Sequence, residues 1–231
     1  RRQRQMCIRD RYVKKEFWIN KWKNKEIGFH QENYNEYLTE FWPEICKDKQ
    51  AVLVPLCGKT KDMLYLIEKG HQVIGIDVSE IAAKEFFLEN KIEFEVREEE
   101  NYKVFFNDDI SFFVGDIFDI KLDELKGAKY LFDRASLIAL PPEIRKKLAH
   151  LLFRDLKITD GLVITMSFDD DELGPPFSVP PADVVDLLAG KYKITEVETH
   201  IEQGSEVTVH SGKISTRFEH IMRLSESIIK I

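Results

Sequence analysis

The 231-residue sequence has a globular composition, with 43% hydrophobic and 32% charged residues. Its formal net charge of −7 excludes a nucleic acid as the main partner, since a phosphate backbone requires a basic surface. No apolar run approaches the roughly 20 residues that cross a bilayer, so no membrane partner is expected. The three cysteines form no Cys-x-x-Cys pair, which argues against disulfides and structural zinc and favours a cytoplasmic protein.

The N-terminal segments differ in character. Residues 1–13 are rich in arginine and lack a clear apolar period, so we expect a tail outside the fold; the alternative is that their apolar side chains begin a helix. Amphipathic helices are predicted over 14–25 and 33–46, and the first places Trp18 and Trp22 on one face.

Short apolar runs then alternate with helical patterns. Strands are predicted at 51–56 and 72–79, and helices follow them at 61–70 and 80–90. This order is typical of a parallel sheet with right-handed crossovers. Later elements continue the pattern. Three segments, 92–96, 102–106 and 110–116, are each a candidate strand. They are followed by a strand and turn at 128–140, a helix at 143–156, a strand at 161–168, a helix at 182–190, and strands at 192–200 and 215–224.

The last two strands have no helix between them, so we expect them to pair antiparallel. Without a repeat or a linker, residues 14–231 are predicted to form one α/β domain, in which 14–46 is a helical cover. The predicted fold is a single doubly wound, mostly parallel seven-stranded sheet with helices on both faces and an antiparallel C-terminal hairpin. Class I methyltransferases that use S-adenosylmethionine have this Rossmann-like arrangement, an analogy of fold alone.

The stretch LVPLCGKTKDM, residues 53–63, contains a Gly-Lys-Thr sequence like the end of a phosphate-binding loop. Such a loop requires a glycine where this chain has Leu53, so we exclude it. A dinucleotide fingerprint is also excluded, because Gly58 is the one glycine between Gly28 and Gly70. The loop offers little room for a pyrophosphate.

Asp77 ends the second predicted strand, nineteen residues after Gly58. An acid at this position accepts hydrogen bonds from ribose hydroxyls, which favours a nucleoside without a diphosphate. The alternative is that Asp77 caps the next helix, although Ser79 is better placed to do so. Asp116, at another strand end beside Ile117, is interpreted either as an adenine contact or as a helix N-cap.

Seven segments in chain order resemble the thiopurine S-methyltransferase family, particularly its bacterial members. They are FWINKWKNKEIGFHQ (17–31), LVPLCGKTKDM (53–63), GHQVIGIDVSE (70–80), EFF (85–87), GDIFDI (115–120), FDRASLIALPPEIR (132–145) and GPPFSVP (174–180). The resemblance implies S-adenosylmethionine as cofactor, S-adenosylhomocysteine as product and a small thiol or selenol as acceptor, with the protein acting as a monomer.

The resemblance also implies roles for individual residues. The implied cofactor-binding residues are Trp18, Trp22, Phe29, Leu56, Cys57, Gly58, Asp77, Asp116, Ile117 and Arg134. The implied acceptor-binding residues are Phe29, Arg134, Pro175 and Pro176, with Arg134 also the catalytic residue. Two departures from the family are the Asp at 77, where Glu is usual, and the lack of a second arginine within 202–215.

The expected chemistry is an in-line displacement of the sulfonium methyl by the acceptor, which depends mainly on positioning. Arg134 stabilises negative charge on the acceptor or, in the alternative interpretation, pairs with Asp133. No metal site is predicted, and the acidic run 169–171 is interpreted as a solvated loop. Alternative functions are methyl transfer to thiocyanate, halide, or tellurium and selenium oxyanions, and, more distantly, a nicotinamide-dependent oxidoreductase or a silent binding module.

Overall fold

The computed structural model describes residues 15–168, 174–188, 192–201, 207–208, 214–215 and 217–226. These residues form two compact units. The first comprises the described residues up to Glu40 together with Lys47–Ala128, and the second comprises Phe41–Cys46 and the described residues from Lys129 onward. The predicted tail 1–13 lies outside the described residues, and the predicted single domain stays a prediction.

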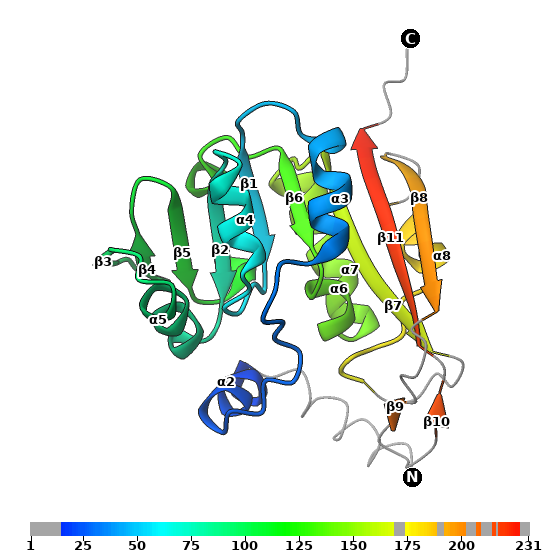
Figure 1. Cartoon of the computed structure of the whole chain (residues 1–231), viewed down its shortest axis with the longest axis horizontal. Coiled ribbons are helices and arrows are strands. Elements are labelled where there is room, and N and C mark those ends of the chain that lie inside the picture. The colour runs from blue at the N-terminus through cyan, green and yellow to red at the C-terminus, as the bar shows by residue number, and fades with distance from the viewer. Residues whose placement is uncertain are drawn as a thin grey trace. The chain divides into compact units, whose positions relative to one another are not determined.

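The first unit is built on five strands in the order β3-β4-β5-β2-β1. Their bounds are β1 Ala51–Pro55, β2 Gln72–Asp77, β3 Glu95–Glu98, β4 Lys103–Phe106 and β5 Ile110–Val114. β1, β2 and β5 pair in parallel, as the alternating pattern predicts, and they point the same way in Figure 1. β4 pairs antiparallel with β5, and β3 pairs antiparallel with β4, so these two strands take the sheet beyond the seven strands expected.

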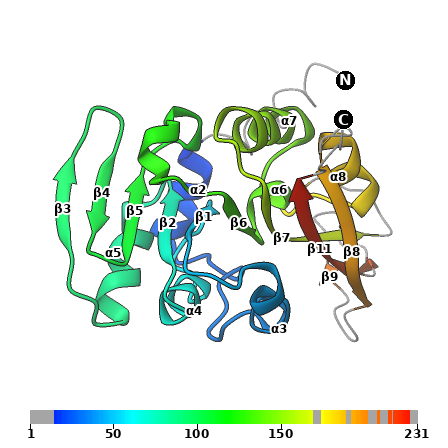
Figure 2. The same ribbon diagram turned by 90° about the horizontal axis from the view of Figure 1, so that it is seen from above.

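The helices of the first unit connect these strands. They are α2 Lys15–Lys23, α4 Asp62–Glu68, α5 Glu80–Glu89 and the short 3-10 turns η1 Ile117–Asp119 and η2 Leu122–Leu125; α3, Glu36–Ile45, begins in this unit. Figure 2 shows α4 and α5 on the same face of the strands. Phe86 and Phe87 of α5 and Phe112 of β5 are fully buried there. Burial of such aromatic side chains provides much of the stabilisation of this layer.

The second unit contains the remaining elements. They are β6 Tyr130–Asp133, α6 Ser136–Ala139, α7 Pro142–His150, the π-helical turn η3 Leu151–Asp155, β7 Asp160–Phe168, α8 Pro181–Leu188, β8 Tyr192–Ile201, β9 Val207–Thr208, β10 Ile214–Ser215 and β11 Arg217–Glu226. The strand order is β6-β7-β11-β8. β6 and β7 are parallel, whereas β11 runs antiparallel to both β7 and β8, so the predicted terminal hairpin is confirmed.

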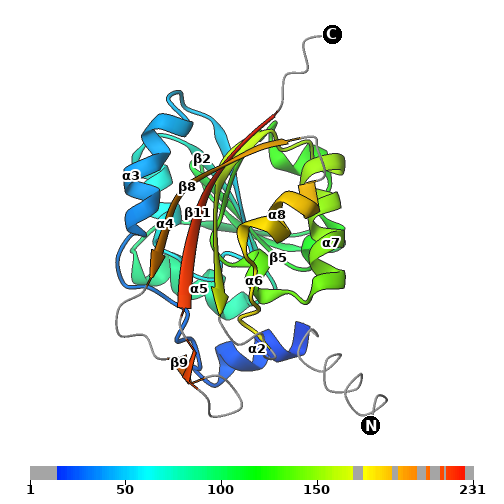
Figure 3. The ribbon, with the colours of Figure 1, turned by 90° about the vertical axis from the view of Figure 1, so that its right-hand side faces the viewer.

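Helices cover one side of these strands. Figure 3 shows α7 and α8 on the same side of β8 and β11. α7 has Pro142 in its first turn, where a missing backbone N–H costs no hydrogen bond. Its Leu148 is fully buried, as are Leu162 of β7 and Ile221 of β11. The alternation of apolar strand and amphipathic helix therefore produces a covered sheet in each unit.

Candidate active site

A tight turn follows β1 and contains the stretch excluded above as a phosphate loop. Leu56 and Gly58 both adopt left-handed backbone conformations, with φ of +47° and +52°. The backbone N–H of Cys57 donates to the carbonyl of Ile76 at 3.1 Å, and that of Gly58 donates to Asp77 Oδ2 at 2.8 Å. The turn is therefore attached to the carboxyl end of β2, where Asp77 lies.

Asp77 is 7% exposed and accepts a hydrogen bond on each carboxylate oxygen. Oδ1 receives the N–H of Ser79 at 2.9 Å, and Ser79 in turn caps α5 by accepting from Ala82 N. Burial raises the pKa of Asp77 to about 6, although the hydrogen bonds from Ser79 and Gly58 oppose that shift. Ser79 is thus the helix cap, and the ribose contact of Asp77 stays a prediction.

Cys57 directs its thiol into the protein interior. A Cβ built on Gly75 of β2 would lie 3.1 Å from Cys57 Sγ and 2.9 Å from Met63 Sδ, so the sulfur packs where β2 has no side chain. Burial raises the pKa of this thiol well above its ordinary value, and the charge of Asp77 adds to the shift. A buried, protonated thiol is no nucleophile, which agrees with Cys57 as a small residue at a tight approach.

Three aromatic side chains predicted as a group lie together in the first unit. The ring of Phe29 lies 5.8 Å from those of Trp18 and Trp22, in edge-to-face contacts. The indole of Trp22 lies over the turn, since a Cβ on Gly58 would come within 2.9 Å of its Cζ2 atom. Trp22 is buried and Phe29 is 44% exposed. Helix α2 is therefore packed on the turn, as a cover would be.

Asp116 begins η1 and caps it. Its Oδ1 accepts from Phe118 N at 3.1 Å, while Oδ2 pairs with Lys15 Nζ of α2 at 2.9 Å. Tyr102 donates its hydroxyl to the Asp116 carbonyl at 2.9 Å, and Ile117 is buried. The N-cap interpretation is thus correct for the chain itself, and the adenine contact stays a prediction.

The remaining predicted residues belong to the second unit. Asp133, at the end of β6, accepts from the backbone of Ala135 and Ser136 and from the Ser136 hydroxyl, and Arg134 lies half-buried in this turn. Burial raises the pKa of Asp133 to about 6. The N–H of Phe177 donates to Ile138 O at 2.7 Å, which brings the segment with Pro175 and Pro176 to α6. The structure thus brings the three predicted acceptor residues of this unit, Arg134, Pro175 and Pro176, to neighbouring segments.

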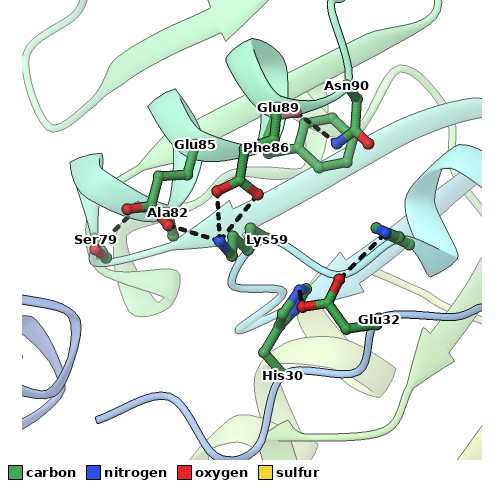
Figure 4. A network of polar contacts seen from close by, with 10 residues as sticks. His30, Glu32, Lys59, Ser79, Ala82, Glu85, Phe86, Glu89 and Asn90 are labelled. Carbon is green, nitrogen blue, oxygen red and sulfur yellow. Dashed lines mark hydrogen bonds and ion pairs between the residues drawn. The ribbon is translucent and has the colours of Figure 1, made fainter. Parts of the chain in front are cut away.

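Two basic residues were missed by the sequence interpretation. Lys59 was given no functional role from the sequence, yet its ammonium pairs with Glu85 and Glu89 of α5 (Figure 4). Two acids at i, i+4 on one helix repel each other unless a cation lies between them, but their spacing does not indicate which cation that is. Arg217 lies just after the range searched for a second arginine, opposite Phe168 at the carboxyl end of β7.

Neither a metal centre nor a membrane helix is found in the described parts of the chain. No group of three or more acidic, histidine or cysteine side chains there could hold a metal ion. The acidic run 169–171 lies outside the described residues. Among the described helices, none combines the length and the apolar character needed to cross a bilayer.

Comparison with known proteins identifies the family. The profile of the thiopurine S-methyltransferase family matches residues 13–227. A thiopurine S-methyltransferase of Pseudomonas fluorescens is 41% identical over 185 residues, covering 79% of this chain and 85% of that protein. One from Teredinibacter turnerae is 36% identical over 217 residues, covering 94% and 99%.

The chain belongs to the thiopurine S-methyltransferase family. As a member it is a methyltransferase that uses S-adenosylmethionine and a small-molecule acceptor, so the predicted family, enzyme class and cofactor are confirmed.

Solved structures support the fold. A methyltransferase from Anabaena variabilis superimposes with a TM-score of 0.61 at 13% identity, covering 94% of this chain and 98% of its own. Magnesium protoporphyrin IX methyltransferase from Synechocystis gives a TM-score of 0.57 at 13% identity, covering 96% and 99%. The predicted class I methyltransferase fold is confirmed.

The contact between Gly58 and Trp22 gives a testable prediction. Gly58→Ala should lower the free energy of unfolding by about 1–2 kcal/mol, because alanine is strained at this φ and its Cβ meets the indole. Displacement of Trp22 toward solvent should shift the tryptophan emission to longer wavelength. Urea denaturation and fluorescence measure the two effects.

Gly28→Ala is the matched control, since a Cβ at Gly28 meets nothing within 4 Å. Truncation of Trp22 should remove part of the cost of Gly58→Ala, because the added methyl group then has room. Equal stability and emission in Gly58→Ala and wild type would contradict the packing of α2 on the turn.

Proposed function

We propose that this chain transfers the methyl group of S-adenosylmethionine to the sulfur or selenium of a small thiol acceptor. The observation that carries the cofactor half of the proposal is the buried Asp77 carboxylate, held by a one-glycine turn beneath the Trp22 indole. Family membership supports the transfer of a methyl group to sulfur.

The residues of the first unit fit a nucleoside joined to an amino acid. Asp77 would offer its carboxylate to ribose hydroxyls, and Gly58 lacks a side chain, which lets the Trp22 indole approach the turn closely. The cover over the cofactor would be formed by Trp18, Trp22 and Phe29. The methionine portion would be bordered by Leu56, Cys57 and Gly58. The adenine would be contacted by Asp116 and Ile117. S-Adenosylmethionine, when bound, supplies a methyl group attached to a sulfonium. Once the methyl group is transferred, the leaving group is the neutral thioether of S-adenosylhomocysteine.

The acceptor side is assigned to Phe29, Arg134, Pro175 and Pro176. A thiolate is anionic, so a cation that faces it stabilises the reactive form and lowers the need for a general base. Arg134 would supply this charge. The Asp133–Ser136 hydrogen bonds orient the turn that carries Arg134. The prolines would limit the size of the acceptor.

A second acceptor class follows from the same cation. Thiocyanate, halides and oxyanions of tellurium or selenium are also anionic, and Arg134 would attract them equally. A nicotinamide dinucleotide fits less well, since its pyrophosphate requires a glycine-rich loop where this chain has Leu53. We further propose that the protein acts as a cytoplasmic monomer, with 14–231 as the methyltransferase domain and 14–46 as its helical cover.

Calorimetry with S-adenosylhomocysteine, NAD and ATP in parallel tests the cofactor assignment. We expect heat with S-adenosylhomocysteine alone. If folded protein gave no heat with S-adenosylhomocysteine, the proposal would be contradicted. Binding of NAD instead of S-adenosylhomocysteine would favour the oxidoreductase. A panel of thiols, selenols, halides and oxyanions then separates the acceptor classes by methyl transfer.

Asp77→Ala should weaken S-adenosylhomocysteine binding at least tenfold, about 1.4 kcal/mol, because two ribose hydroxyls lose their acceptor. Wild-type affinity should also fall as the pH drops below about 6, where the carboxylate takes up a proton. The stability of the free protein should show the opposite trend for this group. Its folded pKa is raised, so its contribution is full below the unfolded pKa and is lost as the pH rises through about 6.

Asp123→Asn, an exposed carboxylate of η2, is the control for the Asp77 measurements. It should leave both the affinity and its pH profile unchanged. Unchanged affinity in Asp77→Ala would show that the ribose assignment is wrong.

Arg134→Met should reduce kcat/KM for an aromatic thiol by roughly a hundredfold, about 2.7 kcal/mol, in the range seen when a charge-stabilising donor is removed. Arg134→Lys, which keeps the charge and loses the planar fork, should retain part of the activity. Steady-state kinetics with saturating cofactor measures both. Full activity in Arg134→Met would remove this residue from the mechanism.

A further inference from the structure

Lys59 is a buried cation directly after Gly58 in the cofactor turn. Its side chain is only 9% exposed, and its ammonium lies 2.8 Å from Glu85 Oε2 and 2.7 Å from Glu89 Oε1. Both carboxylates project from α5, one turn apart (Figure 4). Because a charge at this depth is costly unless it is paired, the two acids determine where the lysine lies.

This pairing gives the turn a second attachment to α5. Gly58 donates to Asp77, whose other oxygen holds Ser79 at the beginning of the helix. Lys59 reaches Glu85 and Glu89 toward the end of the same helix. The backbone N–H of Cys57 also donates to the Ile76 carbonyl, so Lys59 adds a side-chain attachment to a turn that is otherwise held through its backbone.

The same ammonium faces a loop that follows α2. The His30 side chain is 9% exposed, and burial together with the charge of Lys59 lowers the pKa of its imidazole. Glu32, 3.8 Å from His30 Nε2, and Glu89 oppose this shift, whereas Lys61 adds to it. His30 is therefore neutral near pH 7, and the loop that carries Phe29 approaches the turn without adding a second cation.

We propose that Lys59 is a positioning residue for the cofactor, which fixes the turn 56–60 on α5 through Glu85 and Glu89 and thereby holds Asp77 in the orientation that receives the ribose. This inference rests on the proposed function. Lys59 touches no reacting atom and acts through Gly58 and Asp77. In a phosphate-binding loop the lysine of the Gly-Lys-Thr sequence contacts the nucleotide phosphates. In this chain the same lysine would instead support a nucleoside site by pairing with two carboxylates of the protein.

The test compares S-adenosylhomocysteine affinity by calorimetry in wild type, Lys59→Met and Lys59→Arg. Lys59→Met should bind about tenfold more weakly, and Lys59→Arg should remain within about threefold of wild type because it still pairs with both acids. Lys84→Met is the matched control: Lys84 makes a 2.8 Å pair with Glu80 on the same helix. It should leave the affinity unchanged.

The titration of His30, followed by NMR, tests whether the ammonium of Lys59 acts on this loop in the folded protein. Removal of the neighbouring cation in Lys59→Met should raise the imidazole pKa, and Lys84→Met should not change it.

Wild-type affinity in folded Lys59→Met overturns the proposal. If that variant does not fold, the double variant Glu85→Gln with Glu89→Gln must show the weaker binding, and wild-type affinity there overturns it as well. A wild-type protein that binds no S-adenosylhomocysteine contradicts the proposed function and this inference together, whereas failure in the variants alone contradicts only the role of Lys59.

Discussion

The hydrogen bond from Gly58 N–H to Asp77 is the constraint on which the candidate cofactor site depends. The parallel register places Pro55 of β1 beside Ile76 of β2, so the chain must leave β1 within reach of the next strand's end. A left-handed glycine permits the sharp departure and directs its N–H back toward the carboxylate. A carboxylate this deeply buried is costly without such donors, so the turn and Asp77 stabilise each other.

A similar device appears in each of the two units. Asp77 ends β2 and Asp133 ends β6, and each buried carboxylate accepts from the backbone of a serine at or next to the beginning of the following helix. Burial raises both pKa values to about 6, which makes both groups responsive to mild acid. The strand end thus carries a carboxylate that organises the connection to the following helix.

Much of the fold could be predicted from the sequence, because the spacing of apolar residues indicates which faces of a helix or strand are buried. The runs that became β1 and β2 read as strands buried on both faces, and Ser79 was recognised as a helix cap from its chemistry. Strand order was harder, since β4 pairs antiparallel with β5 although its sequence, KVFF, is as apolar as that of a parallel strand. A local pattern cannot distinguish the two, because the direction of pairing is decided by tertiary contacts.

The residues of the candidate site that could be predicted are those whose role follows from nearby sequence. Leu53 excluded a phosphate loop by counting alone, and Asp77 was found from its place at a strand end. Lys59 was missed because its partners lie about thirty residues away on α5. The structural role of Lys59 depends on ion pairs with residues that are distant in the sequence. The spacing of residues within the turn does not identify those partners. The residue-by-residue assignment of Arg134, Pro175 and Pro176 depended on family resemblance.

The position of Cys57 has a consequence for an enzyme of sulfur chemistry. Cys46 and Cys57 are both buried, and the thiol of Cys57 is held protonated beside Gly75 although its backbone borders the candidate cofactor turn. An accessible thiolate at this point would compete with the substrate for the activated methyl group and would exchange with oxidised substrate to form a mixed disulfide. By directing the sulfur into the sheet, the fold protects the enzyme from alkylating itself.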